Sequence, residues 1–559
     1  MFQQRENLDY PELTMFQMIE RAKNEYPDDP AYEFFGKRTS YTKFVEKIEQ
    51  AAKALYSSGI RMGDRITICM PNTPQALVCF YAISRIGAVA NMVHPMSARD
   101  EITYYLNFSK SKMILTMDMF CAKVEEALEK VDHNVTILVA RMSDELPLHI
   151  GVAFIAKQGR KFLKYPNTDH AVLWSKFVKS SDTAVTLPEN IYDEKRTAVI
   201  LYSGGTSGVP KGICLSDRNL NALATQGREV IDVERTKGLS ILSCMPMFHG
   251  FGLGINIHLC LCYGICCILM PTFTPKSYAD MLIKRKPNFI AGVPTIFDAL
   301  LHIKELEKAD LSFLRGMYCG GDSIPIELKK SIDKFLIEHG ATIQVREGYG
   351  LTECVTASCL TPPDRYKEGS IGIAWPDTTY AVVTPGTDEV LPYGEEGEII
   401  ITGPTVMLGY LDNEEETAQT LKVLSDGRTW LYTGDLGSMD EEGFVFFKQR
   451  IKRMIITNGY NVYPSQLEKV IDSCEEVSYS CVIGVDDPKR MHRVKAFIVL
   501  RDGYTPSDEI KNKIMDELKL KIAGYALPKE IEFRSELPRT LVGKVAFRQL
   551  EDEENAKLK

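Results

Sequence analysis

Between Leu239 and Pro275 the sequence contains no aspartate, glutamate, lysine or arginine, and this stretch is long enough to cross a bilayer. Prolines, glycines, histidines and an asparagine interrupt it, which favours a buried strand, loop and helix of a large α/β core over a membrane span. Such a segment also predicts an apolar pocket nearby. The segment Met1 to Asp9 lacks the apolar core of a secretory signal, so we expect a cytoplasmic protein, with peripheral membrane contact left open.

Zinc-type cysteine spacing is also missing, because Cys-x-x-Cys pairs do not recur along the chain. The 14 cysteines lie mostly in apolar segments, which predicts reduced, buried thiols. A net charge of −9 argues against a general nucleic-acid binder. With 559 residues, 45% hydrophobic and 25% charged, and no internal repeat, the sequence predicts a globular enzyme of roughly two to four domains.

Strand-like and helix-like segments alternate from about Ile66 onward, which predicts α/β architecture. The sequence predicts helices over 75–86, 295–302 and 326–339, and strands over 88–92, 288–291, 317–319 and 342–346, closed by Gly292, Gly320 and Gly348. In open parallel sheets ligands collect beyond the strand ends. We therefore expect the segments after Leu201, Cys319 and Arg346 to line one crevice.

The composition changes near Tyr432, where a turn-rich stretch leads into a basic run. Beyond it, strands over 477–485, 494–500 and 530–533 around a helix over 506–522 predict a small α/β unit. Between His133 and Thr186, basic and apolar residues alternate as in an amphipathic helix. Packing of its apolar face on its own domain is favoured over contact with a membrane surface.

The segment from Tyr202 to Gly212 combines glycines, hydroxyl residues and Lys211 directly after the apolar run 197–201, which reads as a buried strand. Glycines bring backbone N–H groups close to an anion, so the pattern predicts a phosphate site. It is not a Walker A loop, because Pro210 precedes the lysine and Gly212 follows it. An ordinary glycine-rich surface loop is the alternative.

Four more motifs follow this loop in a fixed order: Gly348 to Glu353, Tyr432 to Asp435, Arg450 to Lys452, and Pro538 to Thr540 with Gly543-Lys544. In this order and spacing the chain resembles the adenylate-forming superfamily of acyl- and aryl-CoA synthetases, peptide-synthetase adenylation domains and firefly luciferase, and most of all its long-chain fatty-acid–CoA ligases. The resemblance implies that ATP activates a carboxylic acid as an acyl-adenylate, with loss of pyrophosphate. The thiol of CoA then displaces AMP, and Mg²⁺ assists.

The resemblance also implies a role for each residue of these motifs. Catalysis would use Lys544, Glu353, Thr206 and His249, with Thr206 and Glu353 holding Mg²⁺ and His249 gating the acyl site. The nucleotide and CoA would contact Ser203, Gly204, Gly205, Ser207, Gly208, Lys211, Gly320, Gly321, Asp322, Gly348, Tyr349, Gly350, Thr352, Asp435, Arg450, Lys452 and Gly459. Within this set, Tyr349 would stack on adenine, Asp435 and Arg450 would bind the ribose, and Lys452 would be the hinge. Without the resemblance, Glu353 reads as a helix-start carboxylate, Lys544 as an exposed lysine and His249 as a core residue.

The implied organisation is a large multi-subdomain N-terminal domain over 1–449 with parallel sheets flanked by helices, a hinge at 450–452, and a small mobile α/β domain over 453–559. The expected substrate is a medium- or long-chain fatty acid, with an aryl acid or acyl transfer to a carrier protein as the alternatives. A membrane-associated fatty-acid uptake protein and an inactive nucleotide-binding relative also remain open, whereas the carrier-like Asp322-Ser323 is discounted because it lies within the large α/β unit. Asp322 and the segment 485–493 depart from the family pattern, and the oligomeric state is not predicted.

Overall fold

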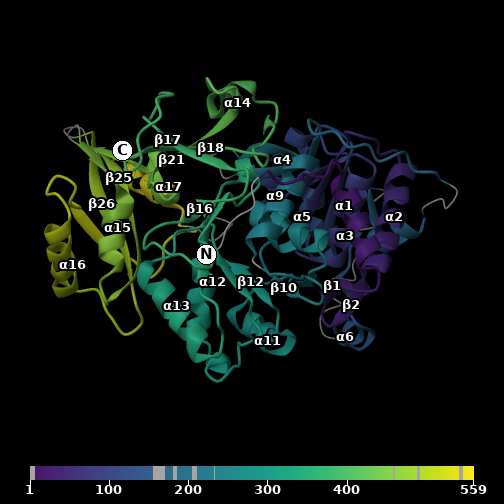
Figure 1. The fold of residues 1–559 in the computed structure, drawn as a ribbon, viewed down its shortest axis with the longest axis horizontal. Coiled ribbons are helices and arrows are strands. Elements are labelled where there is room, and N and C mark those ends of the chain that lie inside the picture. Colours follow the sequence, from purple (N-terminus) through teal and green to yellow (C-terminus); the bar gives the residue numbers. More distant parts are fainter. Residues whose placement is uncertain are drawn as a thin grey trace. The chain divides into compact units, whose positions relative to one another are not determined.

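The computed structural model describes the chain apart from residues 1–6, 155, 157–169, 181–184, 204–209, 232, 458–459, 488–490, 540–544 and 559. Its contacts divide the chain into two compact units (Figure 1). Unit 1 comprises Met1–Tyr380 and Ile401–Tyr432, and unit 2 comprises Ala381–Ile400 and Thr433–Lys559. The predicted hinge at 450–452 concerns motion and stays a prediction. Of the segment from His133 to Thr186 expected to be amphipathic, residues 157–169 lie outside the described residues.

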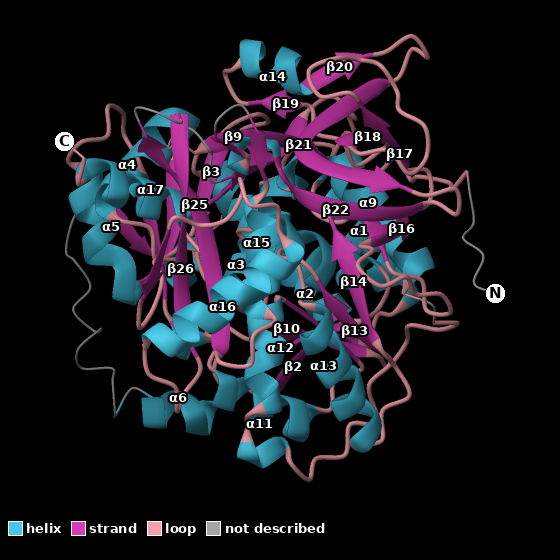
Figure 2. Ribbon diagram, turned by 90° about the vertical axis from the view of Figure 1, so that its left-hand side faces the viewer, coloured by secondary structure: helices cyan, strands magenta, loops and turns pink. Residues whose placement is uncertain are grey.

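Two sheets organise unit 1. In the first, β11 (Cys266–Leu269), β10 (Ser240–Ser243), β12 (Phe289–Gly292), β13 (Gly316–Cys319) and β14 (Val345–Tyr349) run parallel as neighbours in this order. The second has the order β19-β9-β8-β4-β3-β5-β6-β7 and is parallel from β8 (Thr197–Ser203) to β7 (Ala171–Leu173). These parallel strands are largely apolar because helices cover them, and Figure 2 shows α12 (Pro294–Leu301) and α13 (Ile326–Glu338) over the first sheet.

The remaining elements of unit 1 complete these layers. Its other strands are β1 (Pro30–Phe34), β2 (Lys37–Ser40), β3 (Arg65–Cys69), β4 (Val89–Met92), β5 (Met113–Met117), β6 (Thr136–Ala140), β9 (Lys211–Ser216), β15 (Cys359–Leu360), β16 (Gly372–Ala374), β19 (Gly409–Tyr410) and β20 (Leu421–Val423). Its other helices are α1 (Met15–Glu25), α2 (Tyr41–Ser57), α3 (Pro74–Arg85), α4 (Arg99–Ser109), α5 (Cys121–Leu128), α6 (Leu148–Phe154), α8 (Trp174–Lys179), α9 (Asp217–Val230), α10 (Cys260–Cys262), α11 (Pro275–Arg285) and α14 (Glu414–Thr420).

The charge-free stretch is buried, as predicted. It forms β10, the π-helix η4 (Phe251–Leu259), α10 and β11, and most of its apolar residues belong to the main hydrophobic core. Within the described part of the chain, every helix is too short or too polar to cross a lipid bilayer. All 14 cysteines are buried and free of disulfides.

Unit 2 contains a sheet in which β25 (Val477–Asp487) pairs with β26 (Met491–Leu500), and β27 (Glu530–Phe533) runs parallel to β26. Alternate residues of β25 face opposite sides, and Val482 packs with α15 (Pro464–Asp472) and α16 (Asp508–Lys521). Cys481, Ile483 and Val485 pack with α17 (Phe547–Ala556) on the other face. The strands β23 (Ile455–Thr457) and β24 (Tyr460–Val462) extend the sheet.

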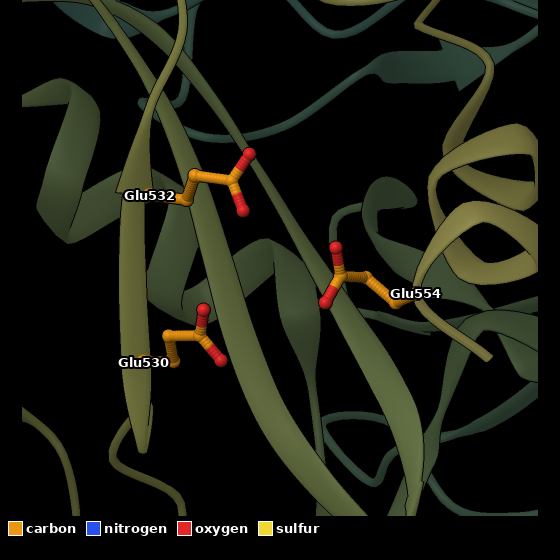
Figure 3. A group of neighbouring side chains, drawn as sticks. All are labelled: Glu530, Glu532 and Glu554. Carbon is orange, nitrogen blue, oxygen red and sulfur yellow. The ribbon is translucent and has the colours of Figure 1, made fainter. Parts of the chain in front are cut away.

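A buried lysine forms ion pairs with three glutamates on the face of this sheet that α17 covers. The Lys495 side chain is only 2% exposed, and its Nζ lies 2.7 Å from carboxylate oxygens of Glu530 and Glu532 and 2.8 Å from Glu554. Figure 3 shows the first two glutamates on one strand and Glu554 on the helix opposite, with the three carboxylates directed toward one another. The ammonium therefore supplies the positive charge that this carboxylate cluster requires.

Two predictions about local structure are wrong in detail. The strand expected at 342–346 is β14, which begins only at Val345 and continues through Gly348 to Tyr349, because those last two residues pair with the antiparallel strand β15. The stretch after Tyr432 is a hairpin of β21 (Thr429–Met439) and β22 (Phe444–Arg450), rather than a run of turns. Glycines suggested turns there, but Gly437 is a strand residue whose Cβ would lie 2.4 Å from the Phe446 carbonyl oxygen. The strands β17 (Thr379–Val383) and β18 (Gly397–Thr402) precede this hairpin in sequence.

Candidate active site

The glycine-rich loop joins two antiparallel strands of the second sheet. Strand β8 ends at Ser203 and β9 begins at Lys211, and these two residues are paired across the ladder. Both ends of the loop are therefore held at one place. The predicted phosphate-loop residues Gly204, Gly205, Thr206, Ser207 and Gly208 lie outside the described residues.

Lys211 is linked to the predicted metal ligand Glu353 through one tyrosine. Its Nζ lies 4.9 Å from the centre of the Tyr410 ring, within cation–π range. The Tyr410 hydroxyl donates a 3.0 Å hydrogen bond to Oε1 of Glu353. The end of the glycine loop and the Gly348–Glu353 motif thus meet, although β8 belongs to a different sheet from β13 and β14. The segments after Leu201, Cys319 and Arg346, which we expected to line one crevice, therefore come from two different sheets.

The segments expected to border adenine lie together at the carboxyl ends of two adjacent parallel strands, β13 and β14. Gly320 to Asp322 follow β13, whereas Gly348 and Tyr349 end β14 and Gly350 follows it. The two segments approach closely, because a Cβ at Gly320 would lie in a tight contact 3.1 Å from the Gly348 carbonyl oxygen. A Cβ at Gly350 would overlap the Thr356 carbonyl oxygen at 1.4 Å. This position in the sheet is typical of nucleotide sites.

Glu353 lies in the short helix η6 (Thr352–Cys354), which ends in a strained turn. Val355 has φ +64° and ψ −59°, and a positive φ is an outlier for a β-branched residue. Such strain costs about 1–3 kcal/mol and is concentrated at functional sites. The sequence did not indicate this turn, because valine has no preference for it.

His249 lies two residues before the π-helix η4, and its backbone contacts the first turn of that helix. Its carbonyl oxygen accepts a 2.9 Å hydrogen bond from the Leu253 N–H, and its Nδ1 lies 3.3 Å from the Phe251 nitrogen. Gly250 packs on the strained turn, since a Cβ there would lie 1.7 Å from the Val355 carbonyl oxygen. The structure therefore brings the predicted acyl gate next to the Glu353 segment, at the start of an apolar π-helix, an element common at functional sites.

In unit 2, the two predicted ribose ligands are opposite each other on the hairpin. Asp435 of β21 pairs in register with Arg450 of β22, and its Oδ1 lies 3.4 Å from the arginine Nε. Asp435 is 2% exposed, whereas Arg450 is half exposed. Lys452 lies in the short helix η7 (Ile451–Arg453). Lys544 and Gly459 lie outside the described residues.

Glu347 is a partly buried carboxyl in the segment that ends β14, and the sequence did not indicate it. Its side chain faces the loop after β13, where Oε1 lies 3.5 Å from the Ile324 nitrogen. Burial raises the pKa of this carboxyl to about 7, and the Ile324 N–H and the Lys329 charge only partly oppose that effect. Its place two residues before Tyr349 could have drawn attention to it, but its burial is not readable from the sequence.

We expect Glu347→Gln to stabilise the protein at pH 8 and to change little at pH 5. The neutral form of Glu347 is favoured in the folded state, so the folded state loses stability as pH rises from the ordinary glutamate value to about 7. A glutamine is never ionised, so the variant avoids this loss of folding free energy. A pKa shift of this size corresponds to about 3 kcal/mol. Melting temperatures of both proteins at the two pH values measure it, with the exposed Glu305→Gln as the control. An equal difference at both pH values would refute the assignment.

Two protein-family models match this chain. A model of the AMP-binding enzyme family matches residues 19–411, and a model of the AMP-binding enzyme C-terminal domain matches residues 466–544. The chain belongs to the AMP-binding enzyme family. This result confirms the resemblance to adenylate-forming enzymes that the five motifs indicated.

Individual relatives of this AMP-binding enzyme cover nearly its whole length. Long-chain-fatty-acid–CoA ligases are 33% identical in Bacillus subtilis, over 98% of this chain and 96% of the relative, and 32% identical in Salmonella typhimurium, over 98% and 95%. A solved anthranilate CoA ligase in complex with anthranoyl-AMP has a TM-score of 0.83 at 22% identity, covering 99% of both chains. That likeness confirms the predicted α/β fold with a large N-terminal and a smaller C-terminal part.

Two further residues at this site, Tyr410 and Glu416, were not predicted. Tyr410 belongs to β19, a two-residue strand paired with β9, and Glu416 belongs to α14. The site residues that they contact, Glu353 and Lys211, are more than fifty positions away in sequence. An acidic helix after Asn413 is visible in the sequence, but it does not indicate which lysine the helix faces.

Proposed function

We propose that this AMP-binding enzyme activates a medium- or long-chain fatty acid with ATP, forms an acyl-adenylate, and transfers the acyl group to CoA. The observation that carries the proposal is 33% identity over 98% of the chain to the Bacillus subtilis long-chain-fatty-acid–CoA ligase. The convergence of Lys211, Tyr410 and Glu353 supports it, because adenylation needs charged groups where the phosphates react.

In the first half-reaction a carboxylate attacks the α-phosphate of ATP, so two anions must approach. We assign Lys211 and the loop backbone to the β- and γ-phosphates, Thr352 to the α-phosphate, and Lys544 to the bridge between carboxylate and α-phosphate. A lysine and oriented N–H donors lower the barrier most when they are already in place.

The residues present fit a magnesium ion. Carboxylate oxygens are ligands that Mg²⁺ prefers, and the Tyr410 hydroxyl orients the Glu353 carboxylate by donating to Oε1. Burial, together with the neighbouring Glu353 charge, raises the pKa of that hydroxyl, which keeps it a donor. Bound Mg²⁺ would neutralise phosphate charge during adenylation, and we assign Glu353, with Thr206, to hold it.

In the second half-reaction the thiol of CoA displaces AMP. We assign Asp435 and Arg450 to the ribose of the nucleotide. The carboxylate can accept hydrogen bonds from both ribose hydroxyls, and the guanidinium can donate hydrogen bonds to them. Rotation of the C-terminal domain at Lys452 would exchange Lys544 for the loop at Gly459 between the two half-reactions.

The acid is apolar, we infer, because His249 leads into the charge-free π-helix η4, which is buried in the core. An aryl acid is the second candidate. It is favoured by 28% identity over 92% of this chain to a probable 4-coumarate–CoA ligase of Dictyostelium discoideum.

Acyl-CoA formation across a panel of acids tests the proposal. With purified protein, ATP, Mg²⁺ and CoA, we expect kcat/KM for medium- and long-chain saturated acids to exceed that for benzoate and 4-coumarate by about tenfold or more, since each buried methylene adds binding free energy. Preference for the aryl acids would favour the second candidate. Absence of acid-dependent pyrophosphate release with every acid would contradict both.

A further inference from the structure

Lys211 is held by a carboxylate that none of the five motifs supplies. Its Nζ forms an ion pair with Oε1 of Glu416, and the two side chains are only 18% and 31% exposed. Water and salt screen the attraction between two partly buried charges less than the attraction between two charges at the open surface. In this structure the side-chain partner of the Lys211 ammonium is therefore the carboxylate of Glu416.

The position of Glu416 is fixed by backbone and capping contacts. Its N–H donates a 3.0 Å hydrogen bond to Oδ1 of Asn413, the N-cap of α14. The Tyr410 N–H donates to Oγ1 of Thr417 at 2.9 Å, which joins the same helix to β19. These contacts hold the backbone at Glu416 without involving Lys211.

The backbone next to Lys211 is held by the same strand, β19, that contacts the helix of Glu416. Strand β19 pairs with β9 directly after Lys211, where the Leu411 N–H donates a 2.7 Å hydrogen bond to the Gly212 carbonyl oxygen. Because β9 and α14 are both tied to β19, the lysine and the glutamate are held at short range by the backbone. The pair also lies at the candidate site, since Tyr410 contacts both Lys211 and Glu353.

We propose that Glu416 is a positioning residue that competes with the β- and γ-phosphates of ATP, and with pyrophosphate, for Lys211. When a phosphate arrives, the ammonium either leaves Glu416 or remains between two anions that repel each other. Both outcomes cost binding free energy. Glu416 therefore weakens the hold on ATP and favours release of pyrophosphate, by taking the ammonium back as the product leaves.

The inference rests on the proposed function for the place of the phosphates, but binding alone can test it. Isothermal titration of the full chain, without acid or CoA, gives dissociation constants for a non-hydrolysable α,β-methylene ATP analogue, for pyrophosphate and for AMP. We expect Glu416→Gln to bind the analogue and pyrophosphate about fivefold more tightly, the size of a partly buried ion pair. AMP lacks the β- and γ-phosphates, so its affinity should not change.

The exposed neighbour Glu415→Gln is the matched control, because it removes the same charge from the same helix and should leave all three constants unchanged. Adding Lys211→Met should abolish the gain from Glu416→Gln, and melting temperatures confirm that the variants are folded. Unchanged or weaker binding of the analogue and pyrophosphate in Glu416→Gln, or an equal gain for AMP, would overturn the inference. Failure of the proposed function is seen separately, as loss of acid-dependent turnover in the wild-type protein.

Discussion

Lys544→Ala should reduce acyl-adenylate formation by about a thousandfold while leaving the protein folded. The lysine is assigned to the charge that develops between the carboxylate and the α-phosphate, and removing one such preorganised group costs two to three orders of magnitude in rate. Single-turnover adenylate formation with saturating ATP and acid measures the effect, because it isolates the chemical step from product release.

The matched control for this variant is Lys529→Ala, an exposed lysine of the same unit. We expect it to retain wild-type rates. Thiolysis should also separate the two half-reactions, since Lys544→Ala supplied with preformed acyl-adenylate is expected to make acyl-CoA at a nearly normal rate. Full adenylation activity in Lys544→Ala would show that another group supplies the charge.

Glu353→Gln should lower kcat/KM for ATP by about a hundredfold and weaken the apparent affinity for Mg²⁺. The amide oxygen can still accept from Tyr410, so the local hydrogen bond is kept while the negative charge is lost. The experiment is a magnesium titration of pyrophosphate release, with the exposed Glu338→Gln of α13 as the control. If the variant needed no more magnesium than the wild-type protein, Glu353 would not be a metal ligand.

The helices and strands that the sequence predicted are present in both units, with shifted ends at some of them, because their signals are local. Apolar runs ended by glycine became strands, as at β8 and β12, and periodic segments became helices, as at α13. Prediction failed where pairing decided the outcome. Strand β14 continues through Gly348 because β15 pairs with it, and nothing near residue 348 indicates that partner.

The same distinction applies to the candidate site. The motif residues Lys211 and Glu353 were identifiable, because their neighbours in sequence carry the pattern. Tyr410 and Glu416 were not, since they act only through contacts with residues distant in the chain. The raised pKa of Glu347 was likewise hidden, because burial causes it and packing creates the burial.

Acid-dependent exchange of labelled pyrophosphate into ATP, measured without CoA, tests the central claim most directly. An enzyme that forms a reversible acyl-adenylate must exchange label when ATP and a fatty acid are both present, and must not exchange when the acid is omitted. We predict exchange with a medium- or long-chain acid in the wild-type protein. Acyl-CoA synthesis without any exchange in the absence of CoA would contradict an acyl-adenylate intermediate.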